Sequence, residues 1–303
     1  MKLSLVIATY NRSRSLVRAL ESVVRQTASP EEWECVVVNN NSTDTTAADF
    51  ATFAAAYPQF NLRMVDEPKQ GLSNARNRGI ACATGEYIAI IDDDETIVPE
   101  YIGAYIAFFE GCRTALAAGG AVIARYETER PKWLSRYTEQ MIANPIRFGR
   151  GVTRFPANRI PAGGNMAFRR EAFERYGVFN PALGRNGESL AGGEESDLLE
   201  RMRAAGEVLY YVPQAAIYHH IPDEKLTAER FGRLSYAVGR SKYLRAELHG
   251  TVPALLADER RKRIYTAVLA LFYVLTFRRE KATWLIAMRR GIGAGIADEN
   301  LKK

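Results

Sequence analysis

Residues 87–95 read Tyr-Ile-Ala-Ile-Ile-Asp-Asp-Asp-Glu, an apolar run that stops at four consecutive acids. The run Tyr87–Ile91 lacks alternation with polar residues, which is typical of a strand buried on both faces of a parallel sheet. Asp92, Asp93 and Asp94 then lie where the chain leaves the core. Because three adjacent carboxylates repel one another, they need either a bound divalent cation or a well-solvated turn that caps the next helix.

Similar apolar runs occur upstream at Leu3–Ala8, Cys35–Val38 and Leu62–Val65. Helical patterns separate these runs. One such helical pattern covers Asn74–Ala83 and ends at Gly85. This alternation predicts an α/β fold with a mainly parallel sheet flanked by helices. The polar loops after the first, second and fourth strands then share the carboxyl edge of the sheet, where ligands of such folds bind.

The middle of the chain is less regular. We expect strands at Ala115–Tyr126, within Gly149–Ala162, at Val208–Val212 and at Ala215–Tyr218, and helices at Trp133–Ala143, Glu171–Tyr176 and Glu195–Ala205. Asn180–Gly193 is rich in glycine and polar residues and has no periodicity, so we expect a mobile loop there.

From about Leu226 the sequence becomes helical and basic. Between Lys225 and Lys303 there are seventeen Lys or Arg residues against seven Asp or Glu, whereas the rest of the chain is mildly acidic. Ile264–Phe277 holds fourteen residues without a charge, between basic flanks. A membrane-spanning helix needs about 20 apolar residues, so this run is too short to span. We expect it either to lie in a membrane interface, which the flanking cations favour, or to pack as a core helix on the main domain.

Composition restricts the class of protein. The chain has 303 residues, is 47% hydrophobic and 25% charged, and carries a formal net charge of +6. These values are typical of folded domains and exclude disordered, collagen-like and coiled-coil chains. Three cysteines (Cys35, Cys82 and Cys112) are too few and too scattered for a disulfide scaffold or a zinc site. The first residues carry no cleavable signal pattern, so we expect a cytoplasmic protein.

Six spaced passages resemble the family 2 glycosyltransferases of the GT-A fold. In chain order they read SLVIATYNR, VVVNNNSTD, GLSNARNRGIACATGEYIAIIDDDE, AGGNMAFRREAF, GGEESDLLERMRAAG and VPQAAIYHH, and they cover roughly residues 1–222. So many pieces in the right order make the resemblance specific. It implies a GT-A catalytic domain over residues 1–225, Rossmann-like. Residues 226–303 are then a basic helical C-terminal region, for which the charge pattern favours membrane contact and packing on the main domain is the alternative.

The resemblance also implies a reaction. It implies a hexosyltransferase that moves a sugar from a nucleotide diphosphate sugar to an acceptor hydroxyl, with inversion at the anomeric carbon and with Mg²⁺ or Mn²⁺ as cofactor. The acceptor would be a glycan or a lipid-linked saccharide used in cell-surface glycan or glycolipid synthesis, at the inner face of the cell membrane. Asn180–Gly193 would close over the donor and exclude water.

The resemblance assigns roles by position. Catalysis falls on Glu195, with Glu194 as the second choice, and metal binding falls on Asp94 and His219. Nucleotide-sugar binding falls on Thr9, Tyr10, Arg12, Asn39, Arg76, Asp92, Asp93, Gly164 and Asn165.

Two positions depart from the residues usual in the family. Asn39 stands where the family usually has Asp; its carbonyl accepts a hydrogen bond from a pyrimidine N–H but carries no charge, which leaves the base open. Glu195 stands where the family usually has an Asp as general base, and its extra methylene changes the reach. His219 is chosen over His220 by its spacing from Pro213.

Two other classes of function compete with glycosyl transfer. A nucleotidyltransferase also builds a metal-assisted phosphate site on an α/β sheet, but it normally has a glycine-rich loop after the first strand, and ATYNRSRS contains no glycine. The other class is a non-catalytic protein that binds a nucleotide sugar or a membrane. The basic C-terminal region lacks a zinc, RNP or G-x-x-G signature, so nucleic acid is not expected as a partner.

Overall fold

The computed structural model describes residues 1–186 and 192–301, which form two compact units. As far as they are described, the first unit comprises Met1–Ala124, Pro145–Pro181 and Glu194–His220, and the second comprises Arg125–Asn144, Ala182–Gly193 and Ile221–Lys303. The second unit therefore includes two internal segments besides the C-terminal region that the sequence sets apart at residue 226. The expected mobile loop Asn180–Gly193 falls partly outside the described residues, at 187–191.

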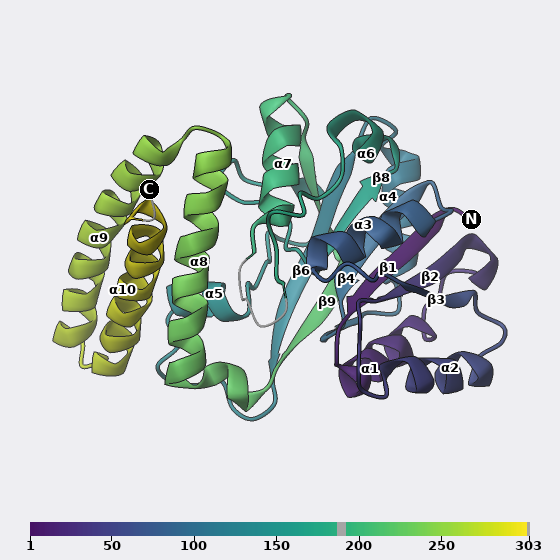
Figure 1. The fold of residues 1–303 in the computed structure, drawn as a ribbon, viewed down its shortest axis with the longest axis horizontal. Coiled ribbons are helices and arrows are strands. Elements are labelled where there is room, and N and C mark those ends of the chain that lie inside the picture. The colour runs from purple at the N-terminus through teal and green to yellow at the C-terminus, as the bar shows by residue number, and fades with distance from the viewer. Residues whose placement is uncertain (187–191, 302–303) are drawn as a thin grey trace. The chain divides into compact units, whose positions relative to one another are not determined.

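The first unit is built on one mixed sheet (Figure 1). Its parallel strands are β1 (Leu3–Thr9), β2 (Trp33–Asn39), β3 (Leu62–Asp66) and β4 (Tyr87–Asp92), with β1 between β2 and β4. Every residue of β1 is buried, as its apolar run predicts. The register places Thr9 beside Asn39 and Ala8 beside Asp92. The polar residues after these strands therefore emerge at one edge of the sheet.

Five more strands extend the sheet beyond β4. They are β8 (Met166–Arg169), β6 (Ala117–Tyr126), β9 (Leu209–Ile221), β5 (Glu95–Ile97) and β7 (Thr153–Arg154). The strand order is β3-β2-β1-β4-β8-β6-β9-β5, with β7 paired to β9. Because β8 joins β4 antiparallel, the sheet is parallel on one side only.

The expectation of two short strands at Val208–Val212 and Ala215–Tyr218 is wrong. One strand, β9, runs through Pro213 without a break. It stays continuous because its two halves pair with different strands: Tyr211 pairs with Thr153 of β7, and Ile217 pairs with Ile97 of β5.

Helices complete the first unit. They are α1 (Ser13–Val23), α2 (Thr46–Ala56), α3 (Leu72–Cys82), α4 (Tyr101–Gly111), α6 (Glu171–Tyr176) and α7 (Glu194–Ala204), with a 3-10 turn at Pro30–Glu32. Two of them bury a predicted apolar stripe against the core: α1 buries Leu16, Leu20 and Val23, and α7 buries Leu198 and Met202. The α/β class predicted from the sequence is confirmed.

The second unit is helical. It holds α5 (Arg136–Ile142), a 3-10 turn at Asp223–Leu226, and three long helices, α8 (Ala228–Leu248), α9 (Val252–Leu275) and α10 (Arg279–Leu301). The helix α5 is shorter than expected because Ser135 and Thr138 cap its start, each hydroxyl accepting a hydrogen bond from the other's backbone N–H. Trp133 instead stacks on Trp284 of α10, with ring centroids 3.8 Å apart.

Glycines allow α8 and α10 to approach each other closely. A Cβ on Gly239 would lie 2.2 Å from the carbonyl oxygen of Ile292, and one on Gly295 would lie 2.1 Å from the carbonyl oxygen of Tyr236. Real Cβ atoms do not occupy such distances, so the packing of these two helices requires glycine at both positions.

The uncharged run Ile264–Phe277 forms the second half of α9 and the turn after it. Many of its apolar side chains are exposed, so it is not a fully buried core helix. In the described part of the chain, every helix is too short or too polar to cross a membrane.

Candidate active site

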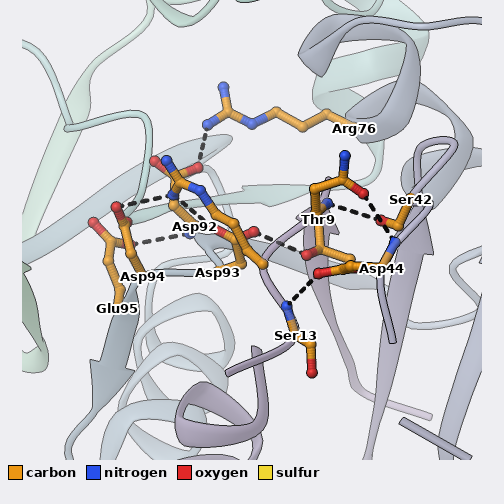
Figure 2. Close-up of polar contacts among 11 residues, drawn as sticks. Thr9, Ser13, Ser42, Asp44, Arg76, Asp92, Asp93, Asp94 and Glu95 are labelled. Carbon is orange, nitrogen blue, oxygen red and sulfur yellow. Dashed lines mark hydrogen bonds and ion pairs between the residues drawn. The ribbon is translucent and has the colours of Figure 1, made fainter. Parts of the chain in front are cut away.

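Two loops at the carboxyl edge of the sheet are tied to each other (Figure 2). The side-chain oxygen of Asn11, after β1, accepts a hydrogen bond from the N–H of Thr43 at 2.6 Å, and the N–H of Asn11 donates to Ser42 at 3.0 Å. The N–H of Ser13 donates to the Asp44 carboxylate at 3.2 Å. Asn11 adopts a φ of 51°, a left-handed conformation that Asn tolerates better than most residues. These contacts fix the first two loops of the site together.

The acidic segment after β4 contacts the first loop (Figure 2). The Thr9 hydroxyl donates to Asp93 at 2.9 Å, and the Arg12 guanidinium lies 3.0 Å from an oxygen of Asp93 and 3.1 Å from one of Asp94. Burial raises the pKa of Asp93 above its usual range, while the charge of Arg12 acts in the opposite direction. Arg12 therefore neutralises part of the charge that the three adjacent acids gather.

Arg76 of α3 is a buried arginine that links three segments of the first unit. Its guanidinium donates to Asp92 at 2.7 Å, to Glu194 at 2.7 Å and to the carbonyl oxygen of Gly163 at 3.1 Å. The planar fork of donors suits this task, because it holds several acceptors in fixed directions. The end of β4 and the start of α7 are thus joined through one side chain.

Glu95 is a site residue that sequence reasoning missed. It opens β5, it is buried, and its carboxylate accepts a hydrogen bond from the N–H of Asp92 at 3.0 Å. A Cβ on Gly164 would lie 2.2 Å from a Glu95 oxygen, so the absence of a side chain at Gly164 makes room for the Glu95 carboxylate. The fourth acid of the run after Tyr87–Ile91 is the signal that points to it.

Three carboxylates form a cluster that fits a metal ion. Oxygen atoms of Asp92, Asp94 and Glu95 all lie within 4.8 Å of one another. Burial, and then the charges of Asp92 and Asp94, raise the pKa of Glu95 well above its usual range. A divalent cation would relieve this repulsion, and an all-oxygen acidic set is the donor chemistry that Mg²⁺ and Mn²⁺ prefer. The residues present therefore fit a hard divalent cation.

His219 lies on β9 directly opposite Glu95. Side chains that oppose each other in an antiparallel pair share one face of the sheet, so His219 is on the side of the carboxylate cluster. Among the described residues, the cluster consists of Asp92, Asp94 and Glu95 and does not include the ring of His219. The neighbouring His220 is engaged elsewhere, since its Nε2 lies 2.9 Å from the Thr96 hydroxyl.

The two glutamates at the start of α7 differ in their surroundings. Glu194 is buried against Arg76, and its second carboxylate oxygen has no hydrogen-bond partner among the described residues. Burial, followed by the charge of Glu195, raises the pKa of Glu194, whereas Arg76 lowers it. Glu195 is half-buried, and its carboxyl carbon would lie 3.5 Å from a Cβ on Gly163. Glu195 is therefore the more accessible of the two.

Asn165 is committed to the interior of the fold. Its side-chain oxygen accepts hydrogen bonds from the hydroxyls of Tyr101 and Tyr105 at 3.1 and 2.7 Å. Its amide nitrogen donates to the carbonyl oxygens of Ala121 and Ala215 at 3.0 and 2.8 Å. All four hydrogen-bonding positions of the amide are filled, so this geometry makes Asn165 a positioning residue, and its role in nucleotide-sugar binding stays a prediction.

A carboxylate lies beside the end of β2, and it comes from the neighbouring strand β3. Asn39 donates to Asp66 at 2.9 Å, and its oxygen accepts a hydrogen bond from the N–H of Ser42 at 3.0 Å. Asp66 ends β3 and pairs in register with Asn39. Tyr10, with 40% of its surface exposed, follows Thr9 at the neighbouring strand end. Sequence reasoning missed Asp66 because only strand pairing brings it next to Asn39.

Comparisons with known proteins agree with this arrangement. The protein-family model for glycosyl transferase family 2 matches residues 4–177 of the chain. The chain is 28% identical over 280 residues to a glucosyl-dolichyl phosphate glucuronosyltransferase of Haloferax volcanii, a match that covers 91% of this chain and 85% of that protein. It is 29% identical over 233 residues to the succinoglycan biosynthesis protein ExoO of Rhizobium meliloti, covering 73% of this chain and 61% of that protein.

A solved structure shares the fold. The mannosyltransferase PcManGT from Pyrobaculum calidifontis, in complex with GDP-Man and Mn²⁺, gives a TM-score of 0.67 at 18% sequence identity, over 99% of this chain and 87% of that one. At this identity the likeness concerns the fold, while the family match covers more than half of the chain. The chain therefore belongs to glycosyl transferase family 2 and is a glycosyltransferase with the GT-A fold.

Proposed function

We propose that this glycosyltransferase moves a sugar from a nucleotide diphosphate sugar to an acceptor hydroxyl, with inversion, with Glu195 as base and with Mg²⁺ or Mn²⁺. The observation that carries the proposal is the pair of bonds made by Arg76, which joins Asp92 at the end of β4 to Glu194, the neighbour of Glu195. The candidate donor site and the candidate base therefore lie around one buried guanidinium.

The nucleotide of the donor would lie on the loops after β1 and β2. Tyr10 is exposed beside this edge and offers a ring face to the base. Asn39 and Asp66 together offer an amide and a carboxylate to the polar edge of the base. The similar mannosyltransferase structure holds a guanine nucleotide sugar, and a carboxylate such as Asp66 suits the N–H donors that guanine presents.

The diphosphate of the donor would lie beside the acids after β4. Asp92, Asp94 and Glu95 would hold the divalent cation, and His219 lies on the same side of the sheet. When bound, the cation supplies charge neutralisation to the leaving diphosphate. Arg12 contacts the same acidic segment and adds a second positive charge to that side of the site.

Glu195 would take the proton from the acceptor hydroxyl. Its carboxyl group lies against Gly163, whose carbonyl oxygen is held by Arg76. Glu194 would not act as the base, because it is buried and its carboxylate is paired with Arg76, which it orients. A positioned base without a protein nucleophile leads to a single displacement, which inverts the anomeric carbon.

The names of the relatives favour an acceptor on a cell-surface glycan. One relative acts on a glucosyl-dolichyl phosphate and another serves succinoglycan biosynthesis. We therefore propose a glycan or a lipid-linked saccharide as the acceptor. Membership of the glycosyltransferase family sets aside the nucleotidyltransferase alternative.

The test measures sugar transfer by Glu195→Gln and Asp94→Asn, with Glu174→Gln on the exposed side of α6 as the matched control. Glu195→Gln should lose roughly 10²–10⁴ in kcat, which is the range for a positioned general base. Asp94→Asn should also lose activity, because it removes a carboxylate that would hold the cation, and the control should keep the wild-type rate. NMR of the product should show the anomeric configuration opposite to that of the donor. Wild-type rates in both site variants, or retention of configuration, would contradict the proposal.

A further inference from the structure

We propose that the outer face of α9 and the turn after it dock on an anionic lipid bilayer and lie in its interface without crossing it. We define the docking face as Ile264, Val268, Leu271, Leu275 and Phe277. All five residues belong to the second unit, so the inference stands on different atoms from the candidate active site.

The docking face is an apolar stripe that points away from the rest of its unit. Ile264, Val268, Leu271 and Leu275 follow the spacing i, i+4, i+7 and i+11, which places them on one side of a helix. Their exposed fractions are 67%, 65%, 59% and 69%. Single exposed apolar residues are common on proteins, but a contiguous stripe of this kind marks an interaction surface.

The opposite side of α9 carries a buried charge and a buried hydroxyl where it meets its neighbours. Glu259, Thr266, Ala270 and Tyr273 follow the same helical spacing and are buried. The Glu259 carboxylate accepts hydrogen bonds from Lys242 of α8 at 2.9 Å and from Arg289 of α10 at 2.5 Å. The charge of Glu259 thus faces the unit interior, while the aliphatic side chains of the docking face point outward. This is the reverse of the pattern of a helix on a water-exposed surface.

The turn after α9 presents an aromatic side chain at a conformational cost. The N–H of Arg278 donates to the carbonyl oxygen of Tyr273 at 2.7 Å and that of Phe277 donates to Val274 at 3.1 Å, which is the Schellman pattern of a helix end. Phe277 occupies the position that normally holds glycine, with a φ of 59°, and is 91% exposed. A bulky residue in this conformation is strained, and such strain concentrates at functional surfaces.

Charge identifies the occupant of the docking face as an anionic membrane. Arg260 and Arg261 precede the apolar stripe at its helical spacing, Arg278 and Arg279 follow it, and all four are exposed. Cations at both ends of an apolar stripe match a bilayer interface, where the apolar groups enter the acyl boundary and the cations meet phosphate headgroups. A second copy of the chain would bring arginines against arginines in either helix direction, which disfavours self-association through this face.

The test is co-sedimentation of the full chain with vesicles of phosphatidylcholine alone and of phosphatidylcholine mixed with phosphatidylglycerol. The wild type should bind the mixed vesicles and bind the neutral ones much less. Val268→Ser, Leu271→Ser and Leu275→Ser combined should weaken binding by about 100-fold or more, because three inserted apolar side chains are lost. Arg278→Gln with Arg279→Gln should weaken it by about 20-fold. Leu248→Ser, at a site on α8 that is 52% exposed, is the control and should bind as the wild type does.

A single variant separates docking from structural support. Phe277→Gly should raise the thermal midpoint, because glycine accepts the left-handed conformation without strain, and should weaken vesicle binding at the same time. A residue that only supported the fold would not show these opposite signs. If Phe277→Gly binds vesicles as tightly as the wild type does, Phe277 does not enter the bilayer and the proposal is wrong.

Three further results would overturn the proposal. They are a wild type that ignores mixed vesicles, a serine triple variant that binds them unchanged, and a wild-type dimer that the same triple variant converts to monomer. Hydrolysis of the nucleotide sugar without vesicles should be unchanged in all these variants, since none lies in the first unit. A variant that loses vesicle binding but hydrolyses the donor normally reports on docking and leaves the proposed chemistry unaffected. A wild type that binds vesicles but does not hydrolyse the donor contradicts the proposed chemistry and leaves docking unaffected.

Discussion

Arg76 limits which substitutions the site tolerates, because two carboxylates and a carbonyl oxygen share one buried guanidinium. Arg76→Gln should lower the free energy of unfolding by about 3–5 kcal/mol, since it leaves the buried Glu194 without its partner. Urea unfolding measures this loss. The double variant Arg76→Gln, Glu194→Gln should recover part of it, and a double variant no more stable than Arg76→Gln alone would show that the pair is not coupled.

The sequence alone predicts that a residue belongs to the site only where a motif marks its position. The acid run after β4, Arg76 and Glu195 are found in this way, because each lies in a passage shared with the family. Asp66 needs the pairing of β2 with β3 to be seen beside Asn39. Conversely, the four hydrogen bonds that occupy Asn165 come from three separate elements, α4, β6 and β9, so its sequence motif could not show that its amide is already filled.

At the scale of elements, the packing of α8 on α10 depends on some glycines of these two helices and not on others. A Cβ on Gly295 would lie 2.1 Å from a carbonyl oxygen of α8, whereas one on Gly232 would meet nothing within 4 Å. Gly295→Ala should therefore destabilise the second unit by about 1–3 kcal/mol through overpacking. Gly232→Ala, the matched control, should stabilise it by up to about 1 kcal/mol through helix propensity. Thermal unfolding showing the same sign for both would contradict the packing described.

The first strands of the sheet are held together by a buried carboxylate. Glu34 of β2 accepts hydrogen bonds from Ser4 of β1 at 2.6 Å, from Thr84 at 2.6 Å and from Arg63 of β3 at 3.0 Å. Burial alone would raise the pKa of Glu34, but the hydrogen bonds from Ser4, Thr84 and Arg63 outweigh it and lower that pKa below 4.5. The ionised group therefore stabilises the folded state above pH 4.5, and this stability is lost as the pH falls through the lowered pKa.

Glu34→Gln tests that contribution. The substitution should lower the free energy of unfolding by about 1.5–3 kcal/mol at neutral pH, where charge-assisted hydrogen bonds are lost. Denaturant unfolding at a series of pH values should show the wild type and the variant converging as the pH falls well below 4.5. A stability difference that does not change with pH would mean that the charge of Glu34 is not what holds the strands.

Elements were predictable where one periodicity dominates. The parallel strands and α1 follow from apolar runs and a helical stripe, and the structure confirms them. The continuity of β9 through Pro213 was not predictable, because it depends on β7 and β5 pairing with its two halves. The outward direction of the apolar face of α9 depends on a buried charge, Glu259, whose partners lie on two other helices.

At the scale of the whole molecule, acidic and basic residues concentrate in different parts of the chain. The acids of the first unit gather at the end of β4, and the excess of Lys and Arg lies in the C-terminal part of the second unit. The first arrangement suits a divalent cation and a diphosphate, and the second suits an anionic surface. The match to the glycosyl transferase family 2 model, over residues 4–177, includes the acid run at the end of β4.

Crystals grown with a nucleotide diphosphate sugar and Mn²⁺, measured by anomalous scattering at the manganese edge, test the central claim most directly. We expect one strong manganese peak bounded by Asp92, Asp94 and Glu95, with the diphosphate of the donor beside it and Glu195 facing the sugar. A manganese peak away from these carboxylates, or a donor bound away from the end of β4, would contradict the site.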